Sequence, residues 1–129
     1  MEHNPPDKSF SFRQRLRSFR FAFRGILLMV KTQHNFQIHL SFTVLVIIAG
    51  FFFHISLAEW MMVIFAIGMV LSAETFNSAI EQLTDLANPD FHPTAGRVKD
   101  LAAGAVLLSA IAAALIGLLI FVPKIMAIL

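Results

Sequence analysis

The chain has 129 residues, of which 57% are hydrophobic and 14% are charged, and its formal net charge is +2. This length allows one domain at most, and the long apolar runs exclude an ordinary soluble domain of this size. The absence of cysteine excludes disulfides and thiolate-bound metals. We therefore predict an all-α integral membrane protein, with a single membrane domain over residues 9–129.

The first 31 residues divide into a polar tail and an amphipathic helix. Residues 1–8 are polar and carry two prolines, so we expect a disordered tail, and no signal-peptide cleavage pattern follows it. Over residues 9–31, apolar side chains recur at helical spacing and cations repeat that spacing one residue later: Phe12, Leu16, Phe19, Phe23, Ile26, Leu27 and Val30, against Arg13, Arg17, Arg20, Arg24 and Lys31. An apolar stripe beside a cationic stripe predicts an interfacial helix.

The first predicted span covers about residues 34–54. Its apolar run, residues 40–53, is shorter than the roughly 20 residues that a bilayer core needs, so the helix must begin within the polar stretch before it. His34 and His39 lie at i and i+5 and share a helix face poorly, which argues against a zinc-binding pair. We interpret both as histidines at the membrane interface.

Two further spans are predicted over about residues 59–86 and 94–122, separated by a loop with two prolines. Residues 54–59 carry no Lys or Arg, whereas most cations precede residue 32 and two more, Arg97 and Lys99, follow the second span. The positive-inside bias therefore places the amino terminus and the loop at residues 86–99 in the cytoplasm, and the carboxyl terminus outside.

A polar stripe in the second span carries the strongest functional signal. Five polar residues fall on one helix face: Glu74, Asn77, Ser78, Glu81 and Asp85. Carboxylates near lipid are costly and normally face a bundle interior, where they mark a site, and their hard oxygens suit Mg²⁺. A structural alternative, in which Lys99 neutralises Glu81 or Asp85, leaves Glu74 without a named partner.

The nucleotide-binding and hydrolase motifs G-x-x-x-x-G-K-[ST], G-x-G-x-x-G, H-E-x-x-H and G-x-S-x-G are absent from the sequence. Another pattern is present. Glu74-x-x-Asn77-Ser78-Ala79-Ile80-Glu81-x-x-x-Asp85, followed by Gly96-x-x-Lys99-Asp100-x-x-Ala103-x-Ala105-Val106, resembles the signature of the small bacterial membrane lipid kinases, the diacylglycerol kinase and undecaprenol kinase family. The resemblance extends over nearly the whole chain, from the interfacial helix to the third span.

This resemblance implies a homotrimer in the bacterial cytoplasmic membrane, with active sites shared between subunits. Each site would transfer the γ-phosphoryl group of ATP, with Mg²⁺, to the hydroxyl of undecaprenol or diacylglycerol. The implied roles are Glu74 as general base and Asn77 as its orienting neighbour; Glu81 and Gln33 as metal ligands; Lys99, Asp100, Asp90, Phe91 and His92 near the nucleotide; and Asn35, Phe36, Trp60 and Ala103 near the lipid. Phosphoryl transfer needs mainly positioning and cations, which agrees with these roles.

One position departs from the family pattern. Where many members have a second metal-binding glutamate, this chain has Gln33, a neutral oxygen donor and a weaker ligand for Mg²⁺. The alternative function is therefore a non-catalytic or regulatory membrane protein that retains the kinase fold. The presence of Glu74, Glu81 and Lys99 argues for the enzyme.

Overall fold

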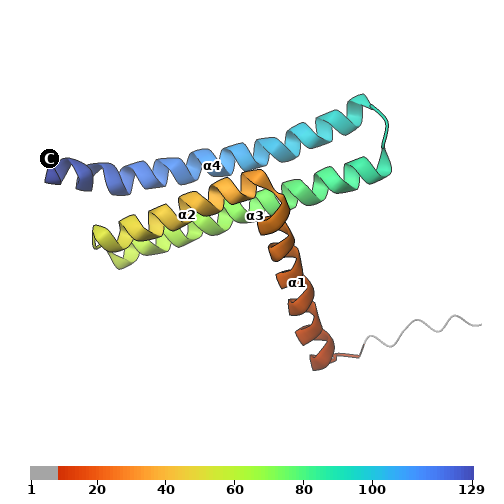
Figure 1. Cartoon of the computed structure of the whole chain (residues 1–129), viewed down its shortest axis with the longest axis horizontal. Coiled ribbons are helices and arrows are strands. Elements are labelled where there is room, and N and C mark those ends of the chain that lie inside the picture. The colour runs from red at the N-terminus through yellow and green to blue at the C-terminus, as the bar shows by residue number, and fades with distance from the viewer. Residues whose placement is uncertain (1–8) are drawn as a thin grey trace, which may run out of the picture.

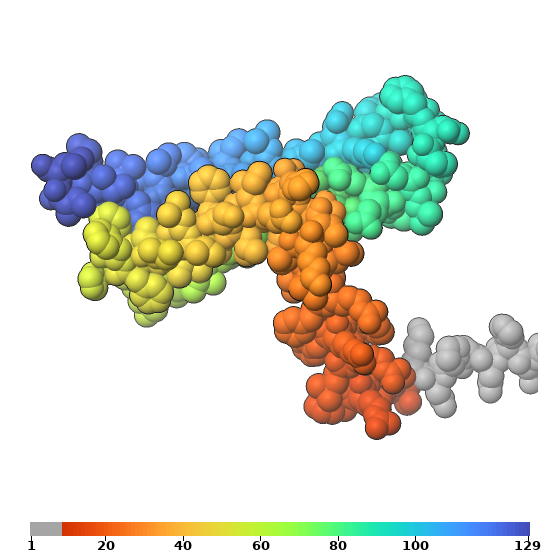
Figure 2. Space-filling model, in the orientation of Figure 1, coloured from red at the N-terminus to blue at the C-terminus, as the bar shows by residue number. Residues whose placement is uncertain are grey.

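The computed structural model describes residues 9–129 and folds them into four helices, with no strand in that range (Figure 1). The helices are α1 (Phe12–Thr32), α2 (His34–Phe52), α3 (Leu57–Ala87) and α4 (Pro93–Ile128). Helices α2, α3 and α4 form an elongated bundle, and α1 leaves it at a steep angle (Figures 1 and 2). The predicted tail, residues 1–8, lies outside the described residues.

Helices α2, α3 and α4 are each long and apolar enough to cross a membrane. Their outward faces carry large exposed apolar side chains along the whole bundle, among them Phe42, Phe65 and Leu108. Such a surface is stable in lipid and would be unstable in water. The predicted all-helical fold is therefore confirmed for residues 9–129, with three helices that are suited to span a membrane.

Helix α1 joins α2 through a single non-helical residue. The Ser11 hydroxyl accepts a hydrogen bond from the Gln14 backbone N–H at 3.4 Å and begins α1. Gln33, with extended backbone angles, ends α1 and directly precedes α2. The Gln37 side chain donates to the Val30 carbonyl at 2.9 Å and so fixes the bend between the two helices. Apart from Met29, no residue of α1 is buried.

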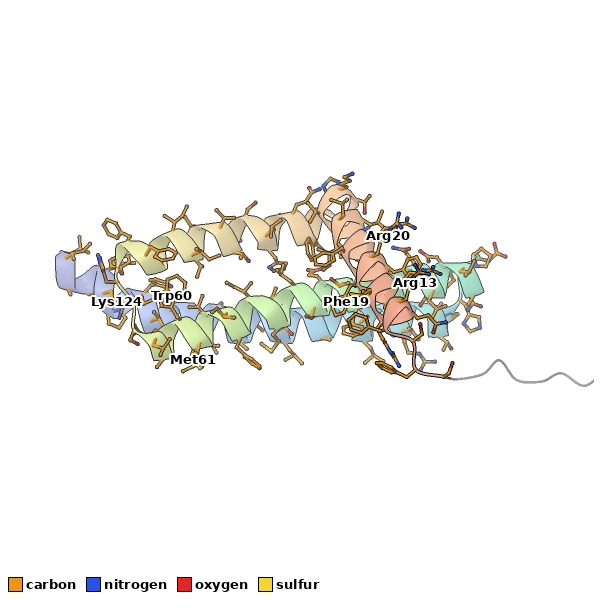
Figure 3. All side chains as sticks on the ribbon, turned by 90° about the horizontal axis from the view of Figure 1, so that it is seen from below. Arg13, Phe19, Arg20, Trp60, Met61 and Lys124 are labelled. Atoms are coloured by element: carbon orange, nitrogen blue, oxygen red, sulfur yellow. The ribbon has the colours of Figure 1, made fainter. Side chains whose placement is uncertain are left out.

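The turn between α2 and α3 is held by a capping box. The Ser56 hydroxyl accepts from the Glu59 backbone N–H, and the Glu59 carboxylate accepts from the Ser56 backbone N–H at 2.8 Å. Lys124 of α4 donates to the same carboxylate at 2.8 Å. Trp60 and Lys124 lie together at the end of the bundle away from the α3–α4 loop (Figure 3). A small apolar core of Ile55, Val63 and Ile120 packs at this end.

Candidate active site

The second half of α3 buries polar side chains although the helix is otherwise apolar. Four polar residues are buried there: Glu74, Asn77, Ser78 and Thr84. Thr84 is satisfied within its own helix, since its hydroxyl donates to the Ile80 carbonyl at 2.7 Å. The others face the inside of a membrane bundle, where polar groups are expensive and normally serve a function.

Glu74 is paired with a histidine from α2. The Nε2 atom of His39 lies 3.2 Å from Oε1 of Glu74, and only 4% of the Glu74 side chain is exposed. A buried carboxylate needs a hydrogen-bond donor, and the imidazole nitrogen is the side-chain group of the described residues that lies near enough to serve as one. The structure thus gives Glu74 the partner that sequence reasoning did not name, and it gives His39, interpreted from the sequence only as a histidine of the membrane interface, a specific contact with α3. His34, one residue into α2, is exposed.

One turn further along α3, Asn77 contacts Glu81. The Asn77 amide nitrogen donates to Oε1 of Glu81 at 3.3 Å, while the buried Oδ1 atom of Asn77 has no hydrogen-bond partner among residues 9–129. Buried polar atoms in folded proteins are nearly always paired. The unpaired amide oxygen therefore indicates a group that binds at this place. No hydrogen bond between the Asn77 and Glu74 side chains is present among residues 9–129.

The end of the bundle beyond Glu81 carries an ion pair between α3 and α4. Lys99 of α4 makes an ion pair with Asp85 of α3. Both line a hollow of about 300 Å³ under the α3–α4 loop, together with Asp90, Phe91 and His92. The His92 ring accepts from the Thr94 backbone N–H at 3.1 Å and caps α4. Asp100 is exposed beside Lys99 and does not line the hollow. Four of the five predicted nucleotide residues therefore gather at one place.

An apolar groove of about 320 Å³ runs between α2, α3 and α4. Small residues of α4, Ala110, Ala113 and Gly117, form one of its walls. Its lining includes two polar side chains, those of His39 and Thr43, both from α2. His39 and Val70 place one end of the groove next to Glu74, because Val70 precedes Glu74 by one helical turn.

The predicted lipid-contacting residues do not all lie near this end. Phe36 is buried and Asn35 exposed at the start of α2, and Ala103 is exposed on α4. Trp60 is 14 residues from Glu74 along α3, which is about 21 Å at 1.5 Å per residue. Trp60 packs instead against Phe51 at the far end, with ring centroids 4.9 Å apart.

The predicted metal ligands fit Mg²⁺ only as part of a larger shell. Residues 9–129 contain no cluster of three or more His, Asp or Glu able to hold a metal. The Glu81 carboxylate and the unpaired Asn77 oxygen are nevertheless hard oxygen donors at one place. Mg²⁺ is commonly held by one or two carboxylates, with phosphate and water oxygens completing its octahedron. Gln33 lies at the α1–α2 junction, where its amide donates to the Thr32 hydroxyl at 3.2 Å.

The fold and site define an integral membrane protein whose buried polar residues lie between an apolar groove and a charged hollow. Comparison with known proteins places this arrangement in a family. Residues 20–121 match the model of prokaryotic diacylglycerol kinase. The chain belongs to this family of lipid kinases, as the sequence signature indicated, and is therefore an enzyme.

Two relatives show how far the likeness extends. The chain is 44% identical over 108 residues to the undecaprenol kinase of Bacillus subtilis (strain 168), an alignment that covers 84% of this chain and 88% of the relative. It is 36% identical over 113 residues to the diacylglycerol kinase of Synechocystis sp. (strain ATCC 27184 / PCC 6803 / Kazusa), covering 87% of this chain and 65% of that protein.

Proposed function

We propose that the protein transfers the γ-phosphoryl group of ATP to the hydroxyl of a membrane lipid alcohol, with undecaprenol preferred over diacylglycerol. The observation that carries the proposal is the buried Glu74 carboxylate, in contact with the half-buried His39 at one end of an apolar groove. A lipid tail in the groove would bring its hydroxyl to a carboxylate that can accept a proton. The fuller match to the undecaprenol kinase supports the preferred acceptor.

Glu74 and the charged hollow have different roles in the proposed reaction. The hydroxyl proton of the lipid passes to Glu74, the hydroxyl oxygen bonds to the γ-phosphorus, and the bond from that phosphorus to ADP breaks. The hollow that contains Lys99 and the Asp90–His92 segment receives the nucleotide. Asp100, which follows Lys99 in α4, is assigned to the same nucleotide site. These residues mainly orient and neutralise the phosphates, which is the larger part of catalysis in phosphoryl transfer.

Glu81 and Asn77 are the residues that would hold Mg²⁺, with Gln33 as a further ligand. Bound there, the cation would neutralise charge on the phosphate oxygens. The donor set of Glu81 and Asn77 is small, so phosphate and water oxygens would complete the shell together with Gln33 from a neighbouring subunit. This requirement supports a homotrimer with shared sites.

The same proposal places α1 and the termini relative to the membrane. Helix α1, with its exposed phenylalanines and arginines, lies in the cytoplasmic interface of the inner membrane (Figure 3). The amino terminus and the α3–α4 loop face the cytoplasm, where ATP is, and the carboxyl terminus lies outside. Phe36, Asn35 and Ala103 then border the lipid near its hydroxyl, and Trp60 contacts its tail.

The test is phosphoryl transfer by the purified protein in vesicles. Labelled ATP and Mg²⁺ are supplied with vesicles that contain undecaprenol, diacylglycerol or neither, and labelled lipid is separated from ATP. We expect labelled undecaprenyl phosphate as the main product and no product without a lipid alcohol. Label on diacylglycerol alone would reverse the preference, and no label on either lipid would favour a non-catalytic protein.

A further inference from the structure

His39 lies at the meeting point of the groove and Glu74. Its Nε2 atom contacts the Glu74 carboxylate at 3.2 Å, and its side chain, 26% exposed, lines the groove. Glu74 itself does not line the groove. A lipid that enters the groove therefore contacts the imidazole before it reaches the carboxylate.

The chemistry of the pair sets the direction of its hydrogen bond. A hydrogen bond across the 3.2 Å contact between His39 and an ionised Glu74 requires that Nε2 carry the hydrogen, because an ionised carboxylate only accepts hydrogen bonds. Such a bond would hold one oxygen of Glu74 and leave the second oxygen for another donor. Among the described residues no other side chain bonds to Glu74. We therefore expect the orientation of the carboxylate to depend on His39.

The position of His39 in α2 is itself well defined. The Thr43 hydroxyl donates to the His39 backbone carbonyl at 2.9 Å, and both side chains line the groove. Phe36, three residues earlier on the same helix face, is buried. The imidazole is therefore held against α3 by its own helix and does not depend on a mobile segment.

We propose that His39 is a positioning residue for phosphoryl transfer, which holds the Glu74 carboxylate at the head of the groove, within reach of the acceptor hydroxyl. The inference rests on the proposed function and adds a residue of α2 to it. One side chain, His39, then contacts the proposed base and also lines the groove. A histidine that only neutralised a buried charge would contribute to stability and leave the turnover of the folded enzyme unchanged.

Three single variants separate these roles. His39→Leu removes the donor, and His39→Gln keeps an N–H donor at a similar reach. His34→Leu is the matched control, because His34 is exposed five residues earlier on the same helix. Each protein is assayed in undecaprenol vesicles for kcat and for the KM of ATP, and its thermal unfolding is recorded.

We expect His39→Leu to lower kcat by about 10- to 100-fold, the size expected when a hydrogen bond to a charged group is lost. The KM of ATP stays unchanged, because the nucleotide hollow is elsewhere. His39→Gln recovers most of the turnover, and His34→Leu behaves as wild type. In a Glu74→Gln background, His39→Leu causes little further loss, because the two residues act as one unit.

Two results would overturn the assignment: wild-type kcat in folded His39→Leu, or a His39→Gln enzyme that is no better than His39→Leu. If His39→Leu does not fold, the assignment is tested by the kcat of His39→Gln and by that of the double variant with Glu74→Gln and His39→Leu. Failure of the proposed function looks different, because the wild-type protein would then phosphorylate neither lipid alcohol.

Discussion

The two ends of α3 are built from similar parts and differ in how completely those parts are paired. Near its start, Glu59 accepts from Ser56 and from Lys124 of α4, at 2.8 Å in each case. In its second half, Glu74 contacts one side chain, His39 of α2, at 3.2 Å. One helical turn away, the Asn77 oxygen is buried without a partner among the described residues.

Burial makes this difference informative. The Glu59 side chain is 29% exposed, whereas that of Glu74 is 4% exposed. A carboxylate at the surface loses little if a partner is removed, because water replaces it. At the buried end water cannot replace a missing partner. The incompletely paired oxygens of Glu74 and Asn77 therefore indicate that a ligand binds there. The comparison teaches that the Glu59 end joins the helices, and it supports our assignment of the chemistry to the Glu74 end.

The largest expected effect is on activity at the Glu74 end. Glu74→Gln keeps the shape and the hydrogen bonding of the side chain but removes the proton acceptor. We expect turnover to fall at least about 100-fold, while nucleotide binding stays intact. The measurement is labelled phosphate transferred to lipid, alongside nucleotide binding at equilibrium.

Glu59→Gln is the matched control at the other end. It loses charge in the pairs with Ser56 and Lys124, so we expect a small decrease in melting temperature and wild-type turnover. If the Glu74 variant turns over at a near-normal rate, or if the two variants lose activity equally, the division of α3 into two functional ends is wrong.

An intermediate effect is expected on stability at the Glu59 end. A Cβ atom at Gly50 would lie 2.6 Å from Cη2 and 2.8 Å from Cζ2 of Trp60. Gly50→Val must therefore displace the indole ring from Phe51, and overpacking of this kind costs about 1–3 kcal/mol. Thermal unfolding in detergent measures the change.

Gly68→Val controls for the change of residue type, because nothing lies within 4 Å of a Cβ atom built at Gly68. We expect a lower melting temperature for Gly50→Val only. Equal melting of the two variants would show that Trp60 moves aside without cost.

The smallest expected effect concerns the metal. Gln33→Glu supplies a carboxylate at the α1–α2 junction, and if Gln33 faces Glu81 of a neighbouring subunit, the added charge strengthens Mg²⁺ binding. We expect a severalfold lower Mg²⁺ concentration for half-maximal activity, and a melting temperature that depends more strongly on Mg²⁺. Gln14→Glu, the same change near the exposed start of α1, should alter neither curve. If neither curve moves for Gln33→Glu, that residue does not face the metal.

Much of the fold could be predicted because hydropathy determines how many helices cross a bilayer. The long apolar runs predicted three spans, and the structure has three helices that qualify. Helix ends are set by local hydrogen bonds, which hydropathy does not report. Helix α3 begins at Leu57, two residues before the predicted span, because Ser56 and Glu59 form a capping box. Helix α4 continues through Pro123 to Ile128.

The candidate site could be predicted only on the helix that carries the motif. Helical spacing placed Glu74, Asn77 and Glu81 on one face, and the structure buries the first two there. The partner of Glu74 comes from α2, and spacing along one helix says nothing about contacts between helices. The sequence nevertheless contains an indication of this contact. Phe36, His39 and Thr43 lie at i, i+3 and i+7 on one face of α2, and a polar side chain on the inward face of a span is normally paired with another polar group.

The length of α3 has a consequence for how the enzyme meets its two substrates. Its 31 residues extend about 46 Å, well beyond a hydrocarbon layer of roughly 30 Å. One helix therefore extends from the hydrocarbon into the aqueous side of the membrane. The nucleotide arrives by diffusion in three dimensions, whereas the lipid alcohol diffuses within a plane. For the lipid, the relevant concentration is its mole fraction in the bilayer. Adding inert phospholipid at constant amounts of enzyme and acceptor therefore slows the reaction by surface dilution, although no inhibitor is present.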